Sequence, residues 1–223
     1  MSFKLFITGT DTNIGKTYIS IQLLKAFTAL GYTTLGIKPI ASGCILKNNQ
    51  LYNDDALALQ QASSLQLPYE KINPFAFLPP IAPHIAAAKI NLSLNVKTIT
   101  QKLTETLQHP VDFQLIEGVG GWQVPLNAQE TMVDLVKHYH WPVLLVVGLR
   151  LGCLNHALLT VQAIQQTNLP FIGWIANVVD PNTAEINPLI QTLETWIDAP
   201  YLGKVDHNHF LSAVNEIVSQ LSR

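Results

Sequence analysis

The sequence predicts an α/β fold, a mostly parallel, doubly wound sheet with helices on both faces. Apolar runs that suit buried strands alternate along the chain with amphipathic runs of helical spacing. Hydrophobic residues make up 48% of the 223 residues, which suits a sheet covered on both sides. Glycine-rich or polar loops follow several of these strands, as at the ligand-binding edge of such a sheet. We therefore expect residues 1–223 to form a single domain.

The individual elements follow from periodicity and from turn residues. β-favouring apolar runs predict strands at residues 3–7, 32–40, 111–116, 142–147, 171–179 and 201–205. Helical spacing of apolar residues predicts helices at 19–30, 56–61, 96–107, 131–140, 157–166, 186–196 and 211–221, with a short one near 85–88. Residues 45–53 are expected to be an exposed loop. The proline-rich stretch 68–84 is expected to be irregular, either a lid or a long connection.

The clearest chemical signal lies between the first strand and the first helix. Residues 9–17 read Gly-Thr-Asp-Thr-Asn-Ile-Gly-Lys-Thr. Small loop residues let backbone N–H groups converge on an anion, and the helix start adds a positive dipole end. Lys16 can reach the outer phosphates of a nucleotide, and the Thr17 hydroxyl can bind its Mg2+. The stretch predicts a phosphate-binding loop (P-loop) and a P-loop NTPase-like fold. The alternative is a solvated turn capped by Thr12 or Asn13.

A lysine stands at the end of the second predicted strand. Pairing in strand 32–40 must stop near Pro39, because proline has no N–H to donate. Lys38 then lies at the carboxyl end of a buried strand, where α/β proteins bind ligands. Its side chain points into that crevice, unless it extends along the protein to the surface.

Carboxylates follow at two further places. Asn53, Asp54 and Asp55 precede the helix at 56–61, and an N-cap role explains only one of them. One of the two aspartates is therefore a candidate metal ligand, and the spacing alone does not choose between them. Glu117 ends the strand at 111–116 and is followed directly by glycines, which fits a metal and phosphate contact.

The last candidate binding residue is an asparagine, Asn177. Asn177 lies near the end of the strand at 171–179 and could contact the edge of a nucleotide base. Its alternative role is that of a turn residue before the Asp-Pro-Asn sequence at 180–182.

Composition excludes several classes of protein. The formal net charge of −2 and the lack of a Lys/Arg cluster argue against a nucleic-acid surface. We expect no membrane partner, because no apolar run reaches about 18 residues. The P-loop begins within ten residues of the start, which leaves no room for a secretory signal. Cys44 and Cys153 are too few for a disulfide framework, so we expect free thiols and a cytoplasmic location.

Taken together, the motifs resemble those of the dethiobiotin synthetase family. The resemblance runs in order from residue 5 to about 203. It rests on the P-loop and on the sequences at 38–43, 53–59, 73–75, 83–84, 117–122, 151–156 and 173–177. It implies an ATP-dependent enzyme that carboxylates 7,8-diaminopelargonate with CO2 and closes the ring to dethiobiotin, a step of biotin synthesis. It also implies Mg2+ and a homodimer.

The resemblance assigns roles to particular residues. It implies that Lys16 and Lys38 are catalytic, and it selects Asp55, with Thr17 and Glu117, as the Mg2+ ligands. Nucleotide contacts are implied for Asn13, Ile14, Gly15, Lys16, Thr17, Tyr18, Asp55, Glu117, Gly118, Val119, Gly120, Asn177 and Val178. Substrate contacts are implied for Thr12, Lys38, Ser42, Gly118, Leu151, Gly152, Cys153 and Asn155, with 151–155 reaching across the dimer.

Five residues, not four, separate the two glycines of the P-loop, so Thr10 occupies the place of the first glycine of a standard P-loop. The chain also departs from the pattern of the dethiobiotin synthetase family. Asn13 stands where many relatives have Glu, which changes one side-chain contact from the loop. The sequence after Gly203 lacks the usual apolar residue, proline and aromatic residue, so base specificity is open.

Two other classes of protein share this fold. A switch ATPase of the partitioning or division-site type would carry a second lysine at the position of Asp11, and would use a basic or amphipathic surface. A small-molecule kinase would give a phosphorylated product instead of a cyclised urea and free phosphate.

Overall fold

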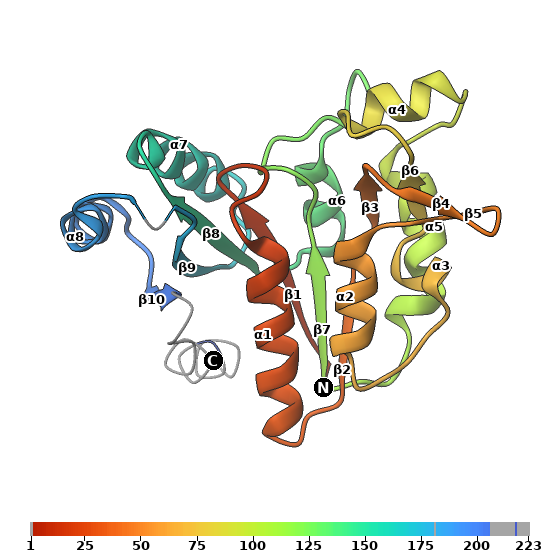
Figure 1. The fold of residues 1–223 in the computed structure, drawn as a ribbon, viewed down its shortest axis with the longest axis horizontal. Helices are drawn as coiled ribbons and strands as arrows, with labels where there is room; N and C mark the ends of the chain where they lie inside the picture. The colour runs from red at the N-terminus through yellow and green to blue at the C-terminus, as the bar shows by residue number, and fades with distance from the viewer. Residues whose placement is uncertain (1, 181, 206–216, 218–223) are drawn as a thin grey trace.

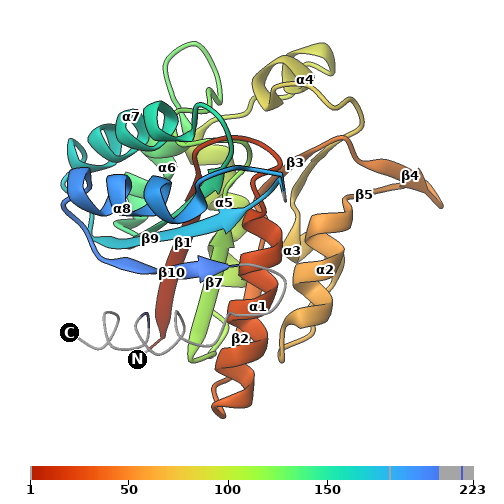
Figure 2. The same ribbon diagram turned by 60° about the vertical axis from the view of Figure 1, so that its left-hand side comes forward.

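The computed structural model describes residues 2–180, 182–205 and 217, and its centre is a six-stranded parallel sheet (Figures 1 and 2). The strand order is β10-β9-β8-β1-β7-β2. The strands are β1 (Phe3–Gly9), β2 (Thr34–Ile37), β7 (Phe113–Glu117), β8 (Val143–Leu149), β9 (Phe171–Val178) and β10 (Tyr201–Val205). The doubly wound parallel sheet predicted from the sequence is confirmed.

Helices cover both faces of the sheet. Alternate residues of β1 point to opposite sides, so that Leu5 and Ile7 pack in one core cluster and Phe6 in the other. The first cluster packs under α1 (Lys16–Ala29), which Figure 1 shows in front of the sheet. The second cluster is covered chiefly by α5 (Val96–Leu107), α6 (Met132–Tyr139), α7 (Cys153–Gln165) and α8 (Ile186–Trp196).

The segment between β2 and α5 is more regular than predicted. Strand β2 ends at Ile37, and the chain then forms β3 (Ile40–Ser42), which pairs with β6 (Phe75–Phe77) in a separate small sheet. The proline-rich stretch 68–84 thus contains α3 (Tyr69–Ile72) and β6, and α4 (Pro83–Lys89) begins at its end. The prediction of one strand over 32–40 was wrong because the break at Lys38-Pro39 separates two sheets.

A β-hairpin replaces the loop predicted at 45–53. Strands β4 (Ile45–Lys47) and β5 (Gln50–Tyr52) pair antiparallel. Both residues between them, Asn48 and Asn49, have left-handed backbone angles, with φ of 50° and 60°. Consecutive left-handed residues suit a tight two-residue turn, and Asn tolerates this conformation better than most residues.

Helix boundaries also refine the prediction. α2 (Asp54–Ala62) begins directly after Asn53, whose side chain accepts a hydrogen bond from the Ala56 N–H and is therefore the N-cap. α7 begins at Cys153, four residues earlier than predicted, after Gly152 with φ of 90°. The helix predicted at 211–221 and the sequence after Val205 lie outside the described residues, apart from Ile217, which is helical.

Among the residues that the structure describes, we find no helix with both the length and the apolar character that a bilayer crossing requires.

Candidate active site

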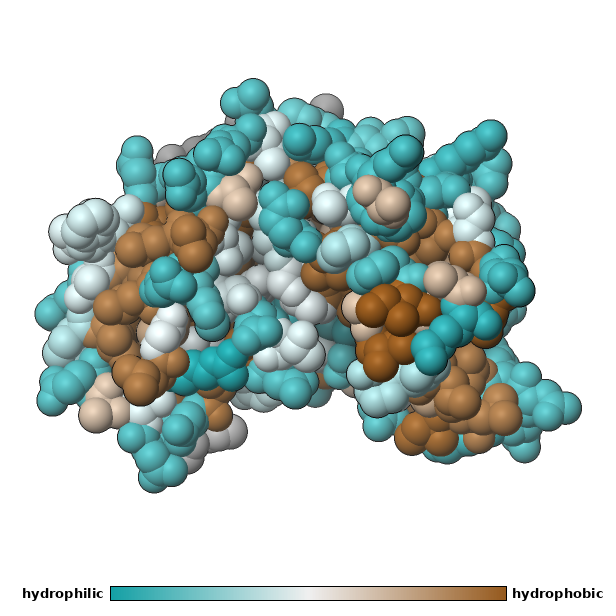
Figure 3. Space-filling view, turned by 90° about the horizontal axis from the view of Figure 1, so that it is seen from above, coloured by the Kyte–Doolittle hydropathy of each residue, from teal (hydrophilic) through white to brown (hydrophobic). Residues whose placement is uncertain are grey.

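A cavity of about 950 Å3 opens at the carboxyl edge of the sheet. Figure 3 looks onto this edge and shows pale and hydrophilic residues in its middle, with hydrophobic groups to either side. The cavity is lined by Thr12, Asn13, Gly15, Lys16, Thr17, Lys38, Ser42, Asn53, Asp55, Pro80, Ile81, Ala82, Pro83, Glu117, Val119, Gly120, Gly121, Gln123, Val124 and Pro125. The loops after β1, β2 and β7 therefore meet in one place, as their positions at parallel strand ends predict.

The loop 9–17 has the backbone of an anion-binding loop. Asn13 and Gly15 adopt left-handed angles, with φ of 57° and 86°, and α1 begins at Lys16. In the described part of the chain no side chain caps this helix, so the alternative of a turn capped by Thr12 or Asn13 is wrong. Uncapped N–H groups at a helix start are the donors that a phosphate requires.

Lys16 is a buried cation rather than a surface charge. It is 7% exposed, and its Nζ donates a hydrogen bond of 2.7 Å to the backbone oxygen of Asp11. Burial lowers the pKa of Lys16 to about 8, against the opposing effect of Glu117. At neutral pH the ammonium is therefore still mostly charged and can meet a phosphate.

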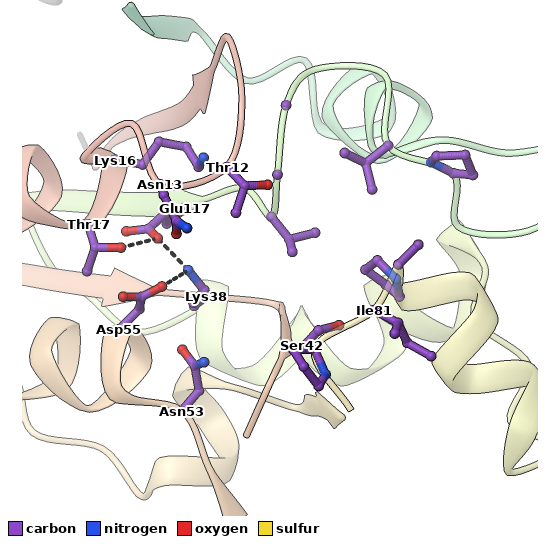
Figure 4. A pocket seen from close by; sticks show the side chains of 18 of the residues that line it. Thr12, Asn13, Lys16, Thr17, Lys38, Ser42, Asn53, Asp55, Ile81 and Glu117 are labelled. Carbon is purple, nitrogen blue, oxygen red and sulfur yellow. Dashed lines mark hydrogen bonds and ion pairs between the residues drawn. The ribbon is translucent and has the colours of Figure 1, made fainter. Parts of the chain in front are cut away.

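Lys38 lies between two carboxylates (Figure 4). Its Nζ lies 2.8 Å from Asp55 Oδ2 and 2.5 Å from Glu117 Oε1. The Thr17 hydroxyl donates to the same Glu117 oxygen at 2.8 Å. Lys38 is 5% exposed and Glu117 is fully buried, so the alternative in which Lys38 extends to the surface is wrong.

The charges in this cluster stabilise one another. Burial alone would lower the pKa of Lys38, but Glu117 and Asp55 outweigh it and raise that pKa above its usual value. Burial would raise the pKa of Asp55, yet the Lys38 ammonium holds it below its usual value. Lys38 and Asp55 therefore stabilise each other's charged forms, and removing Lys38 would leave the fully buried Glu117 carboxylate without its ion-pair partner.

The oxygen atoms of this cluster fit a magnesium ion. Glu117 Oε2 is buried and has no hydrogen-bond partner among the described residues. Two carboxylates and a hydroxyl are the hard oxygen ligands that Mg2+ takes from protein when phosphates and water complete its shell. Asp55 lines the cavity, whereas Asp54 is exposed and is not part of the lining. The structure thus brings one aspartate of the pair to the site.

Asn177 supports the P-loop from the side of β9. Its Nδ2 donates to the Ile14 carbonyl at 2.8 Å, and the residue is 9% exposed. A Cβ on Gly15 would lie only 2.1 Å from that Nδ2, so the loop backbone and the amide are in close contact. Among the described residues with predicted nucleotide contacts, Ile14, Tyr18, Gly118, Asn177 and Val178 do not line the cavity.

The loop after β8 contacts the P-loop through an ion pair. Arg150 donates to the Asp11 carboxylate, and Thr10 N donates to Val146 O at 3.0 Å. In the part of the chain that the structure describes, residues 151–155 do not line this cavity, and Leu151 is fully exposed. Residues 151–155 therefore follow the arginine that contacts the P-loop but lie outside the cavity of their own protomer.

Arg150→Met should raise the KM for ATP no more than about fivefold, because a partly exposed ion pair contributes roughly 0.2–1 kcal/mol. The expected cause is a less ordered Asp11, whose carbonyl holds Lys16. Steady-state kinetics at varied ATP would measure the change. Arg150→Lys should restore most of it, and an effect on kcat alone would contradict this role.

Two residues that support the site were not predicted from the sequence, Asn73 and Arg150. Asn73, which is 3% exposed, donates from Nδ2 to the Lys38 carbonyl at 2.7 Å and fixes the backbone at the end of β2. The Tyr69 hydroxyl donates in turn to Asn73 Oδ1 at 3.0 Å. The signal for Asn73 was a polar residue directly before Pro74 in an otherwise apolar run. The signal for Arg150, which pairs with Asp11, was its position as the first polar residue after β8.

A parallel α/β sheet whose first strand leads through this loop into α1 defines a P-loop nucleotide-binding protein. A family model described as an AAA domain matches residues 4–215. The chain is 47% identical over 205 residues to ATP-dependent dethiobiotin synthetase BioD 1 of Salmonella typhi, covering 92% of this chain and 90% of that one. It is 48% identical over 208 residues to ATP-dependent dethiobiotin synthetase BioD of Cellvibrio japonicus, covering 93% and 91%. The chain belongs to the dethiobiotin synthetase family.

Solved structures share the fold at low sequence identity. The septum site-determining protein MinD from Pyrococcus horikoshii, complexed with Mg-ADP, aligns with a TM-score of 0.58 at 13% identity, over 99% of this chain and 89% of that one. Cobyrinic acid a,c-diamide synthase from Mycobacterium smegmatis, with a bound ATP analog and magnesium, aligns with a TM-score of 0.54 at 13% identity, over 99% and 93%. At this identity the likeness concerns the fold alone.

Proposed function

We propose that this protein is an ATP-dependent dethiobiotin synthetase, which joins 7,8-diaminopelargonate and CO2 into the cyclic urea dethiobiotin. The observation that carries the proposal is the meeting of Lys16, at the P-loop, with the Lys38 cluster in one cavity large enough for a second substrate. Family membership supplies the substrate class.

The reaction balances in three steps. One amine adds to CO2, forms a C–N bond and loses a proton to give a carbamate. A carbamate oxygen attacks the γ-phosphorus of ATP, and the bond to ADP breaks. The second amine attacks the carbamate carbon of this mixed anhydride, closes the ring and expels phosphate. No covalent bond to the protein is needed, so the protein's task is to position the groups and to stabilise charge.

The residues of the cavity match that task. Lys16 is placed at the P-loop to hold the outer phosphates, and Lys38 adds a second ammonium for the negative charge on the phosphoryl group and the carbamate. Thr17, Asp55 and Glu117 would hold Mg2+, which neutralises phosphate charge when bound. Burial of Lys38 and Glu117 strengthens these interactions, because a dry site screens charge weakly.

The diamine is proposed to bind in the part of the cavity between the P-loop and β3. Thr12 and Ser42 supply hydroxyl groups there, and Ser42 Oγ is buried without a hydrogen-bond partner among the described residues. Ile81, Val124 and neighbouring prolines form an apolar wall (Figure 4). Such a wall suits an aliphatic chain, while the hydroxyl groups suit its amines.

We also propose a homodimer in which residues 151–155 complete the partner's substrate site. Their position outside the cavity of their own protomer and the full exposure of Leu151 support this arrangement. Asn155→Asp, on the exposed face of α7, should raise the KM for diaminopelargonate by about tenfold through repulsion of the substrate carboxylate. The KM for ATP should stay unchanged. Sedimentation at assay concentration should show a dimer, and a fully active monomer would refute the shared site.

The test of the function is a product assay. ATP consumption should be rapid only when diaminopelargonate and bicarbonate are both present, and mass spectrometry should find dethiobiotin with one ADP and one phosphate per product. A phosphorylated diamine would indicate a kinase. ATP hydrolysis that is indifferent to both substrates would indicate a switch ATPase.

A further inference from the structure

The proposed metal ligands are already engaged by a cation of the protein. Lys38 Nζ lies 2.8 Å from Asp55 Oδ2 and 2.5 Å from Glu117 Oε1. The third proposed ligand, Thr17 Oγ1, donates its proton to the same Glu117 oxygen at 2.8 Å. Figure 4 shows Lys38 pointing between the two carboxylates. One ammonium therefore holds both acidic groups on which a divalent cation would depend.

Lys38 and a divalent cation compete for the same two carboxylates. One oxygen of each carboxylate already accepts a hydrogen bond from the ammonium, and Glu117 Oε2 is left without a partner, so a Mg2+ ion bound to Glu117 would lie close to the Lys38 charge. Two cations in contact with the same two carboxylates, of which Glu117 is fully buried and Asp55 half-exposed, would also repel each other. The Thr17 hydroxyl would have to turn its proton away from Glu117 before its oxygen could face a metal.

The charge of the cluster explains when a metal ion could replace the Lys38 ammonium at the two carboxylates. Lys16 and Lys38 carry two positive charges, and Asp55 and Glu117 carry two negative ones, so the set is balanced. A Mg2+ ion alone would add uncompensated positive charge to a largely buried site. A nucleotide that carries Mg2+ brings phosphate oxygens that compensate the ion and also offer Lys38 a new partner.

We propose that Lys38 acts as a tethered cation that keeps free divalent metal off Asp55 and Glu117, and that a metal–nucleotide complex displaces it towards the phosphates. Lys38 thereby sets the order of binding, because metal enters only with nucleotide. The lysine needed for phosphoryl transfer is freed by the same event. This inference rests on the proposed use of a metal–nucleotide complex and is independent of which amine is the substrate.

Mn2+ binding to the nucleotide-free protein tests the exchange, with electron paramagnetic resonance reporting the free ion. The wild-type protein should bind Mn2+ weakly, and Lys38→Met should bind it about tenfold or more tightly. Lys16→Met is the matched control, because it removes one positive charge from the same cavity and leaves Lys38 paired with the two carboxylates. An equal gain in Mn2+ affinity in both variants would mean that net charge alone causes it, and would overturn the proposal. So would unchanged binding in a folded Lys38→Met protein.

A second measurement uses the wild-type protein, in case Lys38→Met does not fold. The 13Cε signal of Lys38, assigned by its loss in Lys38→Arg, should shift on addition of MgADP and stay in place with MgCl2 alone. A shift with MgCl2 alone would overturn the proposal, as would a signal that MgADP leaves unmoved. Dethiobiotin formation is measured separately, so failure of the exchange and failure of the proposed function are distinguishable.

Discussion

Replacing Lys38 by alanine should lower kcat by at least about 100-fold, the loss typical of removing one preorganised charge from a buried reaction site. The lysine is 5% exposed, its ammonium is paired with Asp55 and Glu117, and the Asn73 side chain donates to its backbone carbonyl, so its main chain is fixed at the cavity. Because the charge it meets develops during phosphoryl transfer, the loss should fall mainly on kcat rather than on the KM for ATP.

Steady-state rates of dethiobiotin formation would measure this loss. Lys71→Ala is the matched control, since Lys71 pairs with Glu105 away from the cavity and its loss should leave kcat nearly unchanged. Thermal unfolding must accompany the assay, because removal of Lys38 leaves the fully buried Glu117 without its ion-pair partner. A folded Lys38→Ala protein with near-normal kcat would remove Lys38 from the reaction.

Replacing Glu117 by glutamine should raise the Mg2+ concentration needed for half-maximal rate by about tenfold or more, because a neutral amide is a far poorer ligand for a hard cation. The change keeps the size of the side chain. The amide oxygen can still accept from Thr17 and Lys38, so the hydrogen bonds to Oε1 have a replacement. The lost groups are the negative charge and the free, buried Oε2.

A Mg2+ titration at fixed, saturating ATP would show the shift. Asp54→Asn removes a carboxylate at the exposed start of α2, outside the cavity, and should leave the titration curve in place. Asp55→Asn should behave like Glu117→Gln, which makes the neighbouring aspartates a matched pair. A Glu117→Gln curve that coincides with the wild-type curve would count against its role as a ligand.

Much of the fold could be predicted because local patterns and topology agree. The alternation of strand and helix predicted a parallel sheet. The positions of Lys38 and Glu117 at strand ends, and of Lys16 at the start of the helix after β1, placed the three residues at one edge. The hairpin at 45–52 was missed because its strands are short and mostly exposed, so they lack the alternating pattern of a half-buried strand. Asn48 and Asn49 were the remaining local signal.

Supporting contacts could not be predicted in the same way. Asn73 contacts the Lys38 backbone across 35 residues of sequence, and Arg150 contacts Asp11 across 139. Neither residue has a local pattern that names its partner. Asn177 was predicted to lie near the end of a strand. Its hydrogen bond to the Ile14 carbonyl was not predicted, because it depends on how β9 packs beside the P-loop.

By itself, the sequence determined the strand–loop–helix motif, the parallel sheet and the set of charged groups at its carboxyl edge, because periodicity and loop chemistry are local properties. The spacing left Asp54 and Asp55 open and the family resemblance chose Asp55, but only the tertiary structure shows that Asp55 lines the cavity and that Lys38 joins it to Glu117. The physical reason is that ion pairing depends on distances between strand ends far apart in the chain, and packing alone sets those distances.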